Sequence, residues 1–496
     1  MNITLIRPPF YAILGYPITH PLNIGYIAAS LEQGEHSVKV IDGEFISQLD
    51  KPNDSLAVRA KGLLAPPKLS EEKLHFMNEA MTNSSHWLWR SLIQRVVATN
   101  PEAVGISCYS TTMTATKIIA NRLKEELPEI PIFCGGIHPT SCPMETLQEL
   151  PGVDYVVAGE GELTVKELIN CIAKGNKGIS LVRGVAYRDS GVPALNPCRP
   201  LVDSLDSLPL PKRVFQDGHY STHVMVTSRG CPYSCSFCAS RVMWSREVRY
   251  RTIGNVIKEL HQLKDMGIKS LRIGDDTFTL SKKRVLEWCD EVWENNLSSL
   301  SYSVGSRADT IDREMAEKLR SVNVTEMSLG IESGSPRIQQ VIKKHLDLTK
   351  VAETVSMLNK LGIHTLCYFM IGHPSETKED IDSTISLIKK LNHSPRNRIE
   401  LNVVCPYPGT ELWALIEKLA IFPSVAEWYS VFHQSKPVVN LTAMSDSELL
   451  QSIDKAYRTI ALHDTRAKIY LASSIAFNNP RGFIKRVRSS LEVNSA

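Results

Sequence analysis

Two long stretches of this chain alternate short apolar runs with amphipathic segments, and this alternation restricts the possible folds more than any other feature. Strands and helices that follow each other in this way are typical of an α/β fold with a parallel sheet. In the first stretch we expect strands at residues 3–7, 38–42, 104–108, 132–135 and 155–158. In the second stretch we expect them at residues 223–227, 270–274, 301–305, 326–331, 365–371 and 399–404.

The two stretches predict two α/β units of different architecture. Residues 1–178 are expected to form a Rossmann-like, doubly wound parallel sheet, with a polar, proline-containing insertion at about 46–85. A small extended segment and a proline-rich linker follow at 179–214. The βα repeats in residues 215–425 predict a partial (β/α)6 barrel of the TIM type, with its site at the carboxyl ends of the strands. Residues 426–496 are expected to be a helical C-terminal region.

Composition limits the class of protein. The 496 residues are 43% hydrophobic and 22% charged, which is typical of a soluble globular protein with more than one core. The net charge of +3 is too small to favour a nucleic-acid partner, and no apolar run approaches the ~20 residues that span a bilayer. The eleven cysteines are an odd and mostly scattered set. Such a set favours a reducing cytoplasm over a disulfide framework, with the scattered cysteines as small core residues.

Cys231, Cys235 and Cys238 form a Cys-x3-Cys-x2-Cys run directly after the first strand of the second stretch. A [4Fe–4S] cluster usually takes four thiolates, so a run of three leaves one iron free to bind a small molecule. Zinc is the alternative, but zinc sites usually take four ligands from paired motifs, and no second such motif follows nearby. The spacing and the preceding strand therefore favour a cluster.

Polar and small residues follow the later strands of the second stretch, at the edge where a barrel has its active site. Ser306 and Asp309 could simply cap the next helix. Carboxylates, hydroxyls and an arginine at one edge could instead hold a ligand that has ammonium, hydroxyl and carboxylate groups. The residues at these ends are Asp275, Asp276, Ser306, Arg307, Asp309, Glu332, Ser333, Gly372 and Pro374.

Together these motifs resemble those of the radical S-adenosylmethionine (SAM) superfamily, over residues ~220–410. The resemblance implies that the three cysteines are catalytic and hold the [4Fe–4S] cluster, with SAM on the open iron. It also implies that Phe237 lies near the SAM adenine and that the strand-end residues contact SAM. Asp275 departs from the pattern, because many members carry a Gly-Gly-Glu motif at its place.

The segments RPP, GGIHPT, DYVVAGEGE and LDSLPLP are similar to those of cobalamin-binding radical SAM proteins, over residues ~1–430. The resemblance implies a cobalamin (B12) site at the strand ends of the first unit, where a large flat cofactor needs small residues. A plainer interpretation is that the glycines only make tight turns. The residues implied are Pro8, Pro9, Ser107, Ser110, Thr111, Gly135, Gly136, His138, Gly159, Glu160, Gly161 and Glu162.

A histidine ligand to cobalt is not evident from the sequence. The chain has no Asp-x-His-x2-Gly motif, which supplies this ligand in many cobalamin proteins. His138 at a strand end and His20 in a loop are candidates, but a hydrogen-bonded polar histidine is the simpler interpretation of both. The resemblance implies cobalamin without a protein histidine on cobalt.

The resemblance implies an enzyme that cleaves SAM reductively and uses cobalamin, most often to methylate an unactivated carbon of a small molecule in specialised metabolism. A one-electron reductant such as flavodoxin or ferredoxin is the expected protein partner. A cobalamin-dependent cyclase or oxidoreductase without methyl transfer, and a non-catalytic cobalamin-binding partner protein, are the alternatives. Tyr302, Tyr368 and Glu400 are candidates for the cavity wall or for scaffold. The basic residues 481–488 are expected to form a solvated helix.

Overall fold

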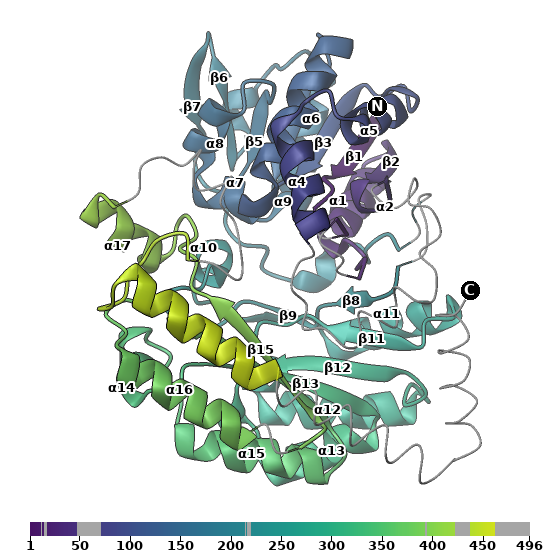
Figure 1. The fold of residues 1–496 in the computed structure, drawn as a ribbon. Coiled ribbons are helices and arrows are strands. Elements are labelled where there is room, and N and C mark those ends of the chain that lie inside the picture. Colours follow the sequence, from purple (N-terminus) through teal and green to yellow (C-terminus); the bar gives the residue numbers. More distant parts are fainter. Residues whose placement is uncertain are drawn as a thin grey trace, which may run out of the picture.

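The structure is a computed structural model of the 496-residue chain (Figure 1). It describes residues 1–10, 12–13, 17–46, 71–213, 215, 220–391, 394–421 and 437–461. Two units lie one above the other in Figure 1, each built on its own sheet.

The first sheet has the strand order β2-β1-β3-β4-β5-β6-β7. Its parallel strands are those that the sequence predicts: β1 (Asn2–Arg7), β2 (Ser37–Asp42), β3 (Ala103–Ser107), β4 (Ile132–Gly135) and β5 (Tyr155–Val157). Apolar side chains on the two faces of the sheet form two cores, each under its own layer of helices. The two layers are α1 (Leu22–Gln33) with α9 (Gly161–Ile172), and α5 (Trp87–Val97) with α6 (Met113–Glu126). The predicted doubly wound arrangement is confirmed.

An antiparallel hairpin extends this sheet. β6 (Val185–Asp189) pairs with β5, and β7 (Val192–Leu195) pairs with β6. The turn uses Ser190 and Gly191, both with positive φ. The sequence predicts only a small extended segment between the units here. The hydrogen bonds instead add it to the first sheet. Such short strands do not reveal in sequence which neighbour they pair with.

Part of the predicted insertion is a helix that packs on the first unit. α4 (Glu71–Thr82) brings Ala80 into the core beside α5, where the Trp89 Nε1 donates to the Ala80 carbonyl oxygen over 2.7 Å. Residues 47–70 of the insertion lie outside the described residues. Three shorter helices complete the unit: α2 (Gly43–Ile46), α7 (Ile137–Ser141) and α8 (Pro143–Glu149).

The second sheet is all parallel, in the order β15-β14-β13-β12-β11-β8. Its strands are β8 (His223–Met225), β11 (Ser270–Ile273), β12 (Ser301–Ser306), β13 (Val324–Glu332), β14 (His364–Ile371) and β15 (Asn397–Val403). Every second side chain of β12 is buried. The surrounding helices are α11 (Ile253–Asp265), α12 (Lys282–Glu294), α13 (Arg313–Ser321), α15 (Leu348–Lys360) and α16 (Lys378–Leu391). Since β8 and β15 are the two edges, the predicted partial barrel is confirmed.

A short ladder and three small helices complete the barrel unit. β9 (Ser228–Arg229) and β10 (Arg249–Tyr250) pair antiparallel, and the cysteine run lies in the loop between β9 and α10 (Ser240–Trp244). α14 (Pro336–Val341) follows β13, and α17 (Glu411–Leu419) follows β15. A helix at residues 446–461 packs Leu449 and Ile453 into the barrel core. The rest of the expected helical C-terminal region, including residues 481–488, lies outside the described residues.

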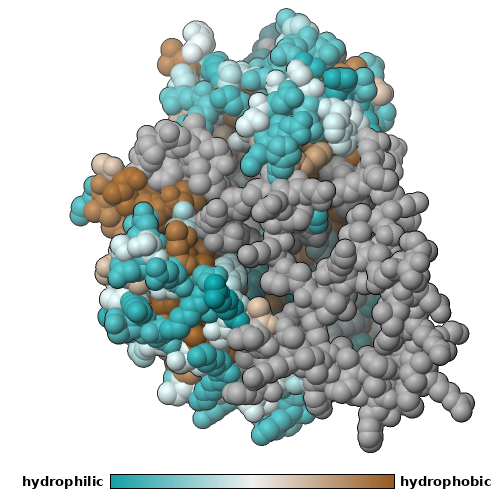
Figure 2. All heavy atoms as spheres, in the orientation of Figure 1, coloured by the Kyte–Doolittle hydropathy of each residue, from teal (hydrophilic) through white to brown (hydrophobic). Residues whose placement is uncertain are grey.

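The described surface is mainly hydrophilic on the face that Figure 2 shows, with apolar side chains gathered around α17. Leu419 is 52% exposed and Ile421 40% exposed there. No helix in the described part of the chain has the length and apolarity needed to cross a membrane. The expectation that the scattered cysteines are core residues was wrong for Cys198, which is exposed because it lies in the extended segment after β7.

Candidate functional site

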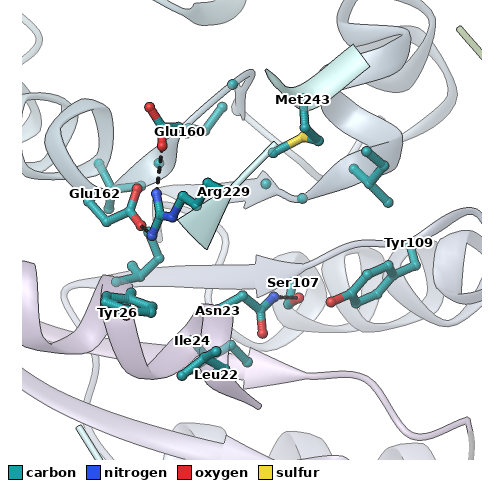
Figure 3. A pocket seen from close by; sticks show the side chains of 18 of the residues that line it. Leu22, Asn23, Ile24, Tyr26, Ser107, Tyr109, Glu160, Glu162, Arg229 and Met243 are labelled. Atoms are coloured by element: carbon teal, nitrogen blue, oxygen red, sulfur yellow. Dashed lines mark hydrogen bonds and ion pairs between the residues drawn. The ribbon is translucent and has the colours of Figure 1, made fainter. Parts of the chain in front are cut away.

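A cavity of about 340 Å³ lies between the two sheets, at the carboxyl ends of their strands. Its volume is in the range of small-molecule sites. Figure 3 shows the side chains that border it, with Asn23 and Ser107 on one side and Arg229 and Met243 on the other. Both units therefore contribute to the same site, as expected where two parallel sheets meet at their carboxyl edges.

The strand ends on the first-sheet side of the cavity carry small residues. Ser107 ends β3, Gly135 ends β4 and Gly159 follows β5. The nearest atoms to a Cβ at Gly135 would be those of Val157, at 3.5 Å, and a Cβ at Gly159 would meet nothing within 4 Å. Gly135 is bare although neighbouring atoms leave room for a side chain, and Gly159, with φ +84°, has a backbone conformation that itself favours glycine. They leave space for a flat ligand against the strand ends.

Gly136 illustrates the plainer interpretation of these glycines. Its φ is +132°, and a Cβ there would lie 2.4 Å from the Cys108 carbonyl oxygen. Only glycine fits such a turn without strain. Gly136 also lines the cavity, so the turn and the open strand end coincide at this residue.

Helix α1 supplies cavity residues that the sequence interpretation missed. Leu22, Asn23 and Tyr26 line the cavity, and the Asn23 Nδ2 donates to the Ser107 Oγ over 2.9 Å (Figure 3). In a doubly wound sheet the helix after a strand begins at the carboxyl edge. The position of α1 after β1 was therefore a signal that could have identified them.

The barrel side of the cavity carries large and charged side chains. Arg229 comes from β9, Met243 and Trp244 from α10, and Asp276 from the end of β11. Sequence interpretation missed the first three, although Arg229 stands two residues before Cys231 and was within reach of the motif. Together with Glu160 and Glu162 of the first unit, this side places charged groups on the cavity wall.

The residues implied for cobalamin fall into two groups. Seven line the cavity: Ser107, Gly135, Gly136, Gly159, Glu160, Gly161 and Glu162. The Glu160 and Glu162 carboxylates accept hydrogen bonds from Arg229, at 2.6 Å each. Five others are not among the described residues that line it: Pro8, Pro9, Ser110, Thr111 and His138. A part for these five in cobalamin binding stays a prediction.

His138 is engaged by its own surroundings. It is 1% exposed, its Nδ1 lies 2.9 Å from the Ser110 Oγ, and its Nε2 lies 3.4 Å from the Cys142 Sγ. Burial lowers the pKa of the imidazole to about 3, so the ring is neutral. His20 is also buried and stacks on Phe215, with ring centroids 5.0 Å apart. Neither arrangement supplies a histidine to the cavity wall among the residues described.

The three predicted cluster cysteines lie together in the loop that begins at Gly230. Only glycine fits at the start of the loop, because Gly230 has φ +100° and a Cβ there would lie 1.9 Å from the Glu247 carbonyl oxygen. Cys231 and Cys235 are half-buried and Cys238 is exposed. Burial raises the pKa of the Cys235 and Cys238 thiols, that of Cys238 to about 11. Since metal ligation requires thiolates, loading a cluster would release protons here.

No group of three His, Cys, Asp or Glu side chains in the described ranges is placed to hold a single metal ion. A [4Fe–4S] cluster would differ from such a site, because each of its three thiolates binds a different iron.

Three strand ends of the barrel lie beside the cysteine loop. The Arg307 guanidinium, after β12, stands 3.9 Å from the centroid of the Tyr233 ring within the loop. Its Nη2 donates to the Lys344 carbonyl oxygen over 3.0 Å, and the Lys344 Nζ lies 2.8 Å from the Glu332 Oε1 at the end of β13. Asp276, after β11, accepts from the Gly230 amide over 3.2 Å. The structure therefore brings Asp276, Arg307 and Glu332 to the loop.

Other residues implied for SAM are held by hydrogen bonds within the protein. Asp275 accepts from the Thr227 amide and hydroxyl and from the Ser228 hydroxyl, each at 2.6 Å. The remaining members show the same pattern: Asp309 pairs with Arg307, Ser306 with Thr279, Ser333 with Thr384, and the Gly372 amide with Glu376. Their contact with SAM stays a prediction. The Phe237 ring of the cysteine loop lies near the His373 ring, with ring centroids 6.4 Å apart. His373 and Pro374 both belong to the loop after β14.

Of the three candidates for the cavity wall, Tyr302 belongs to the scaffold. It is buried under the helices beside Trp288, and its hydroxyl donates to the Leu297 carbonyl oxygen over 2.9 Å. Of the two roles left open by the sequence, the scaffold applies to Tyr302, because its side chain falls on the helix-facing side of β12. Tyr368 and Glu400 are half-buried register neighbours on β14 and β15, and neither is among the described residues that line the cavity.

Comparison with known families divides the chain at the same place as the two sheets. Residues 77–169 match the B12 binding domain, and residues 225–388 match the Radical SAM superfamily. An uncharacterised methyltransferase of Pyrococcus horikoshii is 30% identical over 470 residues, covering 92% of each chain. The anaerobic magnesium-protoporphyrin IX monomethyl ester cyclase of Rubrivivax gelatinosus is 24% identical, covering 74% of this chain and 66% of the cyclase.

The fold has a counterpart among solved structures. The radical SAM methyltransferase TsrM of Kitasatospora setae, solved with cobalamin and a [4Fe–4S] cluster, superposes with a TM-score of 0.65. The match covers 85% of this chain and 78% of that one at 19% identity. At this identity the likeness concerns the fold.

Proposed function

This chain belongs to the cobalamin-binding branch of the radical SAM superfamily, and we propose that it transfers a methyl group from SAM to an unactivated carbon of a small molecule. Its cofactors are a [4Fe–4S] cluster, SAM and cobalamin. The substrate is proposed to belong to specialised metabolism, and the enzyme to work in the cytoplasm with a flavodoxin or ferredoxin as reductant.

One observation carries this proposal: a single cavity is bordered by both units. The bare strand ends at Ser107 and Gly135 form one side, and Arg229 and Asp276, next to the cysteine loop, form the other. A methyl donor on the first side and a carbon activated on the second would meet in this space. Such proximity is what transfer between two bound groups requires.

The chain's own residues bind and orient in this proposal. Cys231, Cys235 and Cys238 would hold the cluster with one iron open to SAM. Arg307 would bind the SAM carboxylate, while Asp276 and Glu332 would bind its ammonium group and ribose hydroxyls. When bound, the cluster supplies the electron that cleaves SAM, and cobalamin supplies the methyl group.

The cavity wall also protects the reaction from water. Leu22, Ile24, Met243 and Trp244 contribute apolar surface between the two sides. Excluding water prevents the side reactions of a reactive intermediate. Removal of a hydrogen atom from carbon transfers no separate proton, so the proposal assigns no general acid or base.

The test is methyl transfer from labelled SAM by anaerobically reconstituted enzyme loaded with cobalamin, screened against candidate metabolites. We expect a product that is heavier by one CH2 group, formed together with 5′-deoxyadenosine. The Cys235→Ala variant should form neither. Absence of SAM cleavage by the wild-type enzyme with a full cluster and reductant would instead support a non-catalytic cobalamin-binding protein.

A second candidate function keeps both cofactors without methyl transfer. The likeness to an anaerobic cyclase over 74% of this chain favours it. In that case the same screen would give a product that has lost hydrogen atoms and carries no label. The product mass therefore separates the two functions.

A further inference from the structure

An ion-pair cluster crosses from the first unit to the barrel at the cavity. Arg229 donates through its Nη1 to the Glu160 Oε1 and through its Nη2 to the Glu162 Oε1, both over 2.6 Å (Figure 3). Glu160 and Glu162 lie at the end of the first sheet, before and within the first turn of α9. Arg229 lies in β9, directly before the cysteine loop. The contact therefore joins the cobalamin side to the cluster side through one side chain.

A second arginine, Arg249, donates to the Glu160 carboxylate. The Arg249 Nη1 donates to the Glu160 Oε2 over 2.8 Å, and the Val202 amide donates to that oxygen over 2.7 Å. Arg249 is the register partner of Arg229 in the β9–β10 ladder. Both strands of the ladder that carries the cysteine loop are thus tied to Glu160.

The ion pairs of Arg229 and Arg249 with the two glutamates are buried, so their geometry is closely constrained. Glu160 is 4% exposed and Arg229 is 8% exposed. The Arg229 guanidinium also stands over the Tyr26 ring at 5.1 Å and the Trp244 ring at 5.5 Å. Burial would raise the pKa of Glu160, but its bonds from Arg249, Val202 and Arg229 outweigh burial and hold it below its ordinary value. Buried charges of this kind remain favourable only while their partners stay in place.

A second buried cluster shows what is particular to the first. Glu259 of α11 is fully buried between Arg213 and Arg251. These arginines also donate to the Val224 and Val226 carbonyl oxygens, so the Glu259 cluster ties the linker to the β8 side of the barrel. The chemistry is the same in both clusters, but the Arg229 cluster holds residues 160–162 of the first unit and lines the cavity.

We infer that Arg229 is a positioning residue, which fixes the cysteine loop against the cobalamin-binding strand ends and so sets the spacing between the two cofactors. The guanidinium suits this task because its planar fork engages two carboxylates at once, whereas a lysine would supply a single point of attachment. The inference rests on both cofactors being bound, and it does not depend on methyl transfer.

The test measures the spacing directly. The protein, loaded with cobalamin in its paramagnetic cobalt(II) form and with a reduced cluster, is examined by pulsed electron paramagnetic resonance for the coupling between the two centres. The variants are Arg229→Met, Arg229→Lys and Glu162→Gln, and the matched control is Glu259→Gln. Urea unfolding and the content of each cofactor establish that every compared sample is folded and loaded.

We expect a narrow distance distribution in the wild type. It should broaden and shift most in Arg229→Met, less in Arg229→Lys, and least in Glu162→Gln, which keeps the bonds to Glu160. Glu259→Gln should lose stability yet keep the wild-type distribution. If Arg229→Met does not fold, Arg229→Lys and Glu162→Gln decide the question.

An unchanged distribution in folded Arg229 variants, or an equal change in Glu259→Gln, would overturn the inference. Neither result would bear on the proposed function, because the measurement uses no substrate. Conversely, a failure of methyl transfer in the wild-type enzyme would leave the spacing result intact.

Discussion

The two sheets present their carboxyl edges to the same cavity and equip them differently. The first sheet ends in Ser107, Gly135 and Gly159, which leave space, whereas the barrel side brings Arg229 and Asp276 to the wall. A large flat cofactor is held mainly by contact with the protein surface, so its site chiefly requires space at the strand ends. A cluster and SAM are held by charged and ligating groups, so side chains are the main requirement. One topology thus serves both needs, because ligands of parallel sheets bind outside the carboxyl ends of the strands and the residues there differ between the two sheets.

The largest effect that separates the two sides is expected from Cys235→Ala. Removing one of three thiolates should abolish cluster binding and 5′-deoxyadenosine formation, while the bare strand ends still bind cobalamin. Iron content and the visible spectrum measure the first effect, and cobalamin retained after gel filtration measures the second. Loss of both cofactors would show that the two sides are not independent.

The reciprocal change is Gly135→Leu. The residue has ordinary room around its Cβ, so the fold should survive, but the new side chain would enter the space at the end of β4. We expect cobalamin binding to weaken by about 10- to 100-fold, equivalent to the 1–3 kcal/mol typical of overpacking. The cluster should load normally.

Gly254→Leu is the matched control for Gly135→Leu, because a Cβ at Gly254 meets nothing within 4 Å and the residue lies on exposed helix surface. It should leave cobalamin binding unchanged. Equal weakening in both variants would contradict the assignment of Gly135 to the cofactor side.

The charged side should also respond to pH through Glu376. Burial raises the pKa of this carboxyl from its ordinary 4.5 to about 7, although its Oε2 accepts from the Gly372 and His373 amides. The folded state holds the proton more tightly than the unfolded state, so stability is full below about pH 4.5 and falls as pH rises to about 7. The loss is up to about 3 kcal/mol.

Glu376→Gln has no titrating carboxyl and should remove this part of the pH dependence. Urea unfolding of both proteins from pH 5 to pH 8 measures it, and the difference between the two curves isolates Glu376 from other titrating groups. Parallel curves would refute the raised pKa.

The smallest effect is expected from His138→Ala on the first-sheet side. The Ser110 and Cys142 side chains lose a partner, which should cost about 1–2 kcal/mol of stability. The spectrum of bound cobalamin should not change, because the imidazole is engaged behind the cavity wall. A shift in the electron paramagnetic resonance spectrum of cobalt(II) cobalamin would identify His138 as its ligand and break the contrast between an unligated side and a ligating side.

Most of the architecture follows from local patterns. The predicted strand at residues 132–135 coincides with β4, and the one at 301–305 lies within β12. The first run is almost entirely apolar, and the second alternates large apolar with small residues, so both patterns indicate strands directly. The β6–β7 hairpin did not emerge as part of the first unit, because its strands are short and their pairing depends on a neighbour far along the chain. The insertion was expected within the first unit, but its helix α4 was not, because the segment is polar and packs through few side chains.

Within the site, the same distinction holds between nearby and distant partners. The three cysteines fall within one short loop, so their spacing alone indicated a cluster. Glu160 and Arg229 are 69 residues apart, and the local sequence around each residue does not indicate that the two are in contact. The sequence therefore identified the glutamates as part of the site and missed the arginines that hold them.

The sequence by itself determined the local patterns from which the chemistry is predicted: a cysteine run with the spacing of a cluster site, and small residues at strand ends of the first sheet. Both depend on residues that are close in the chain, where covalent spacing sets the geometry. Only the tertiary structure decided that the two sets of strand ends share one cavity and that Arg229 connects them. That arrangement depends on how the two sheets pack, and packing is the sum of many contacts that no single segment encodes.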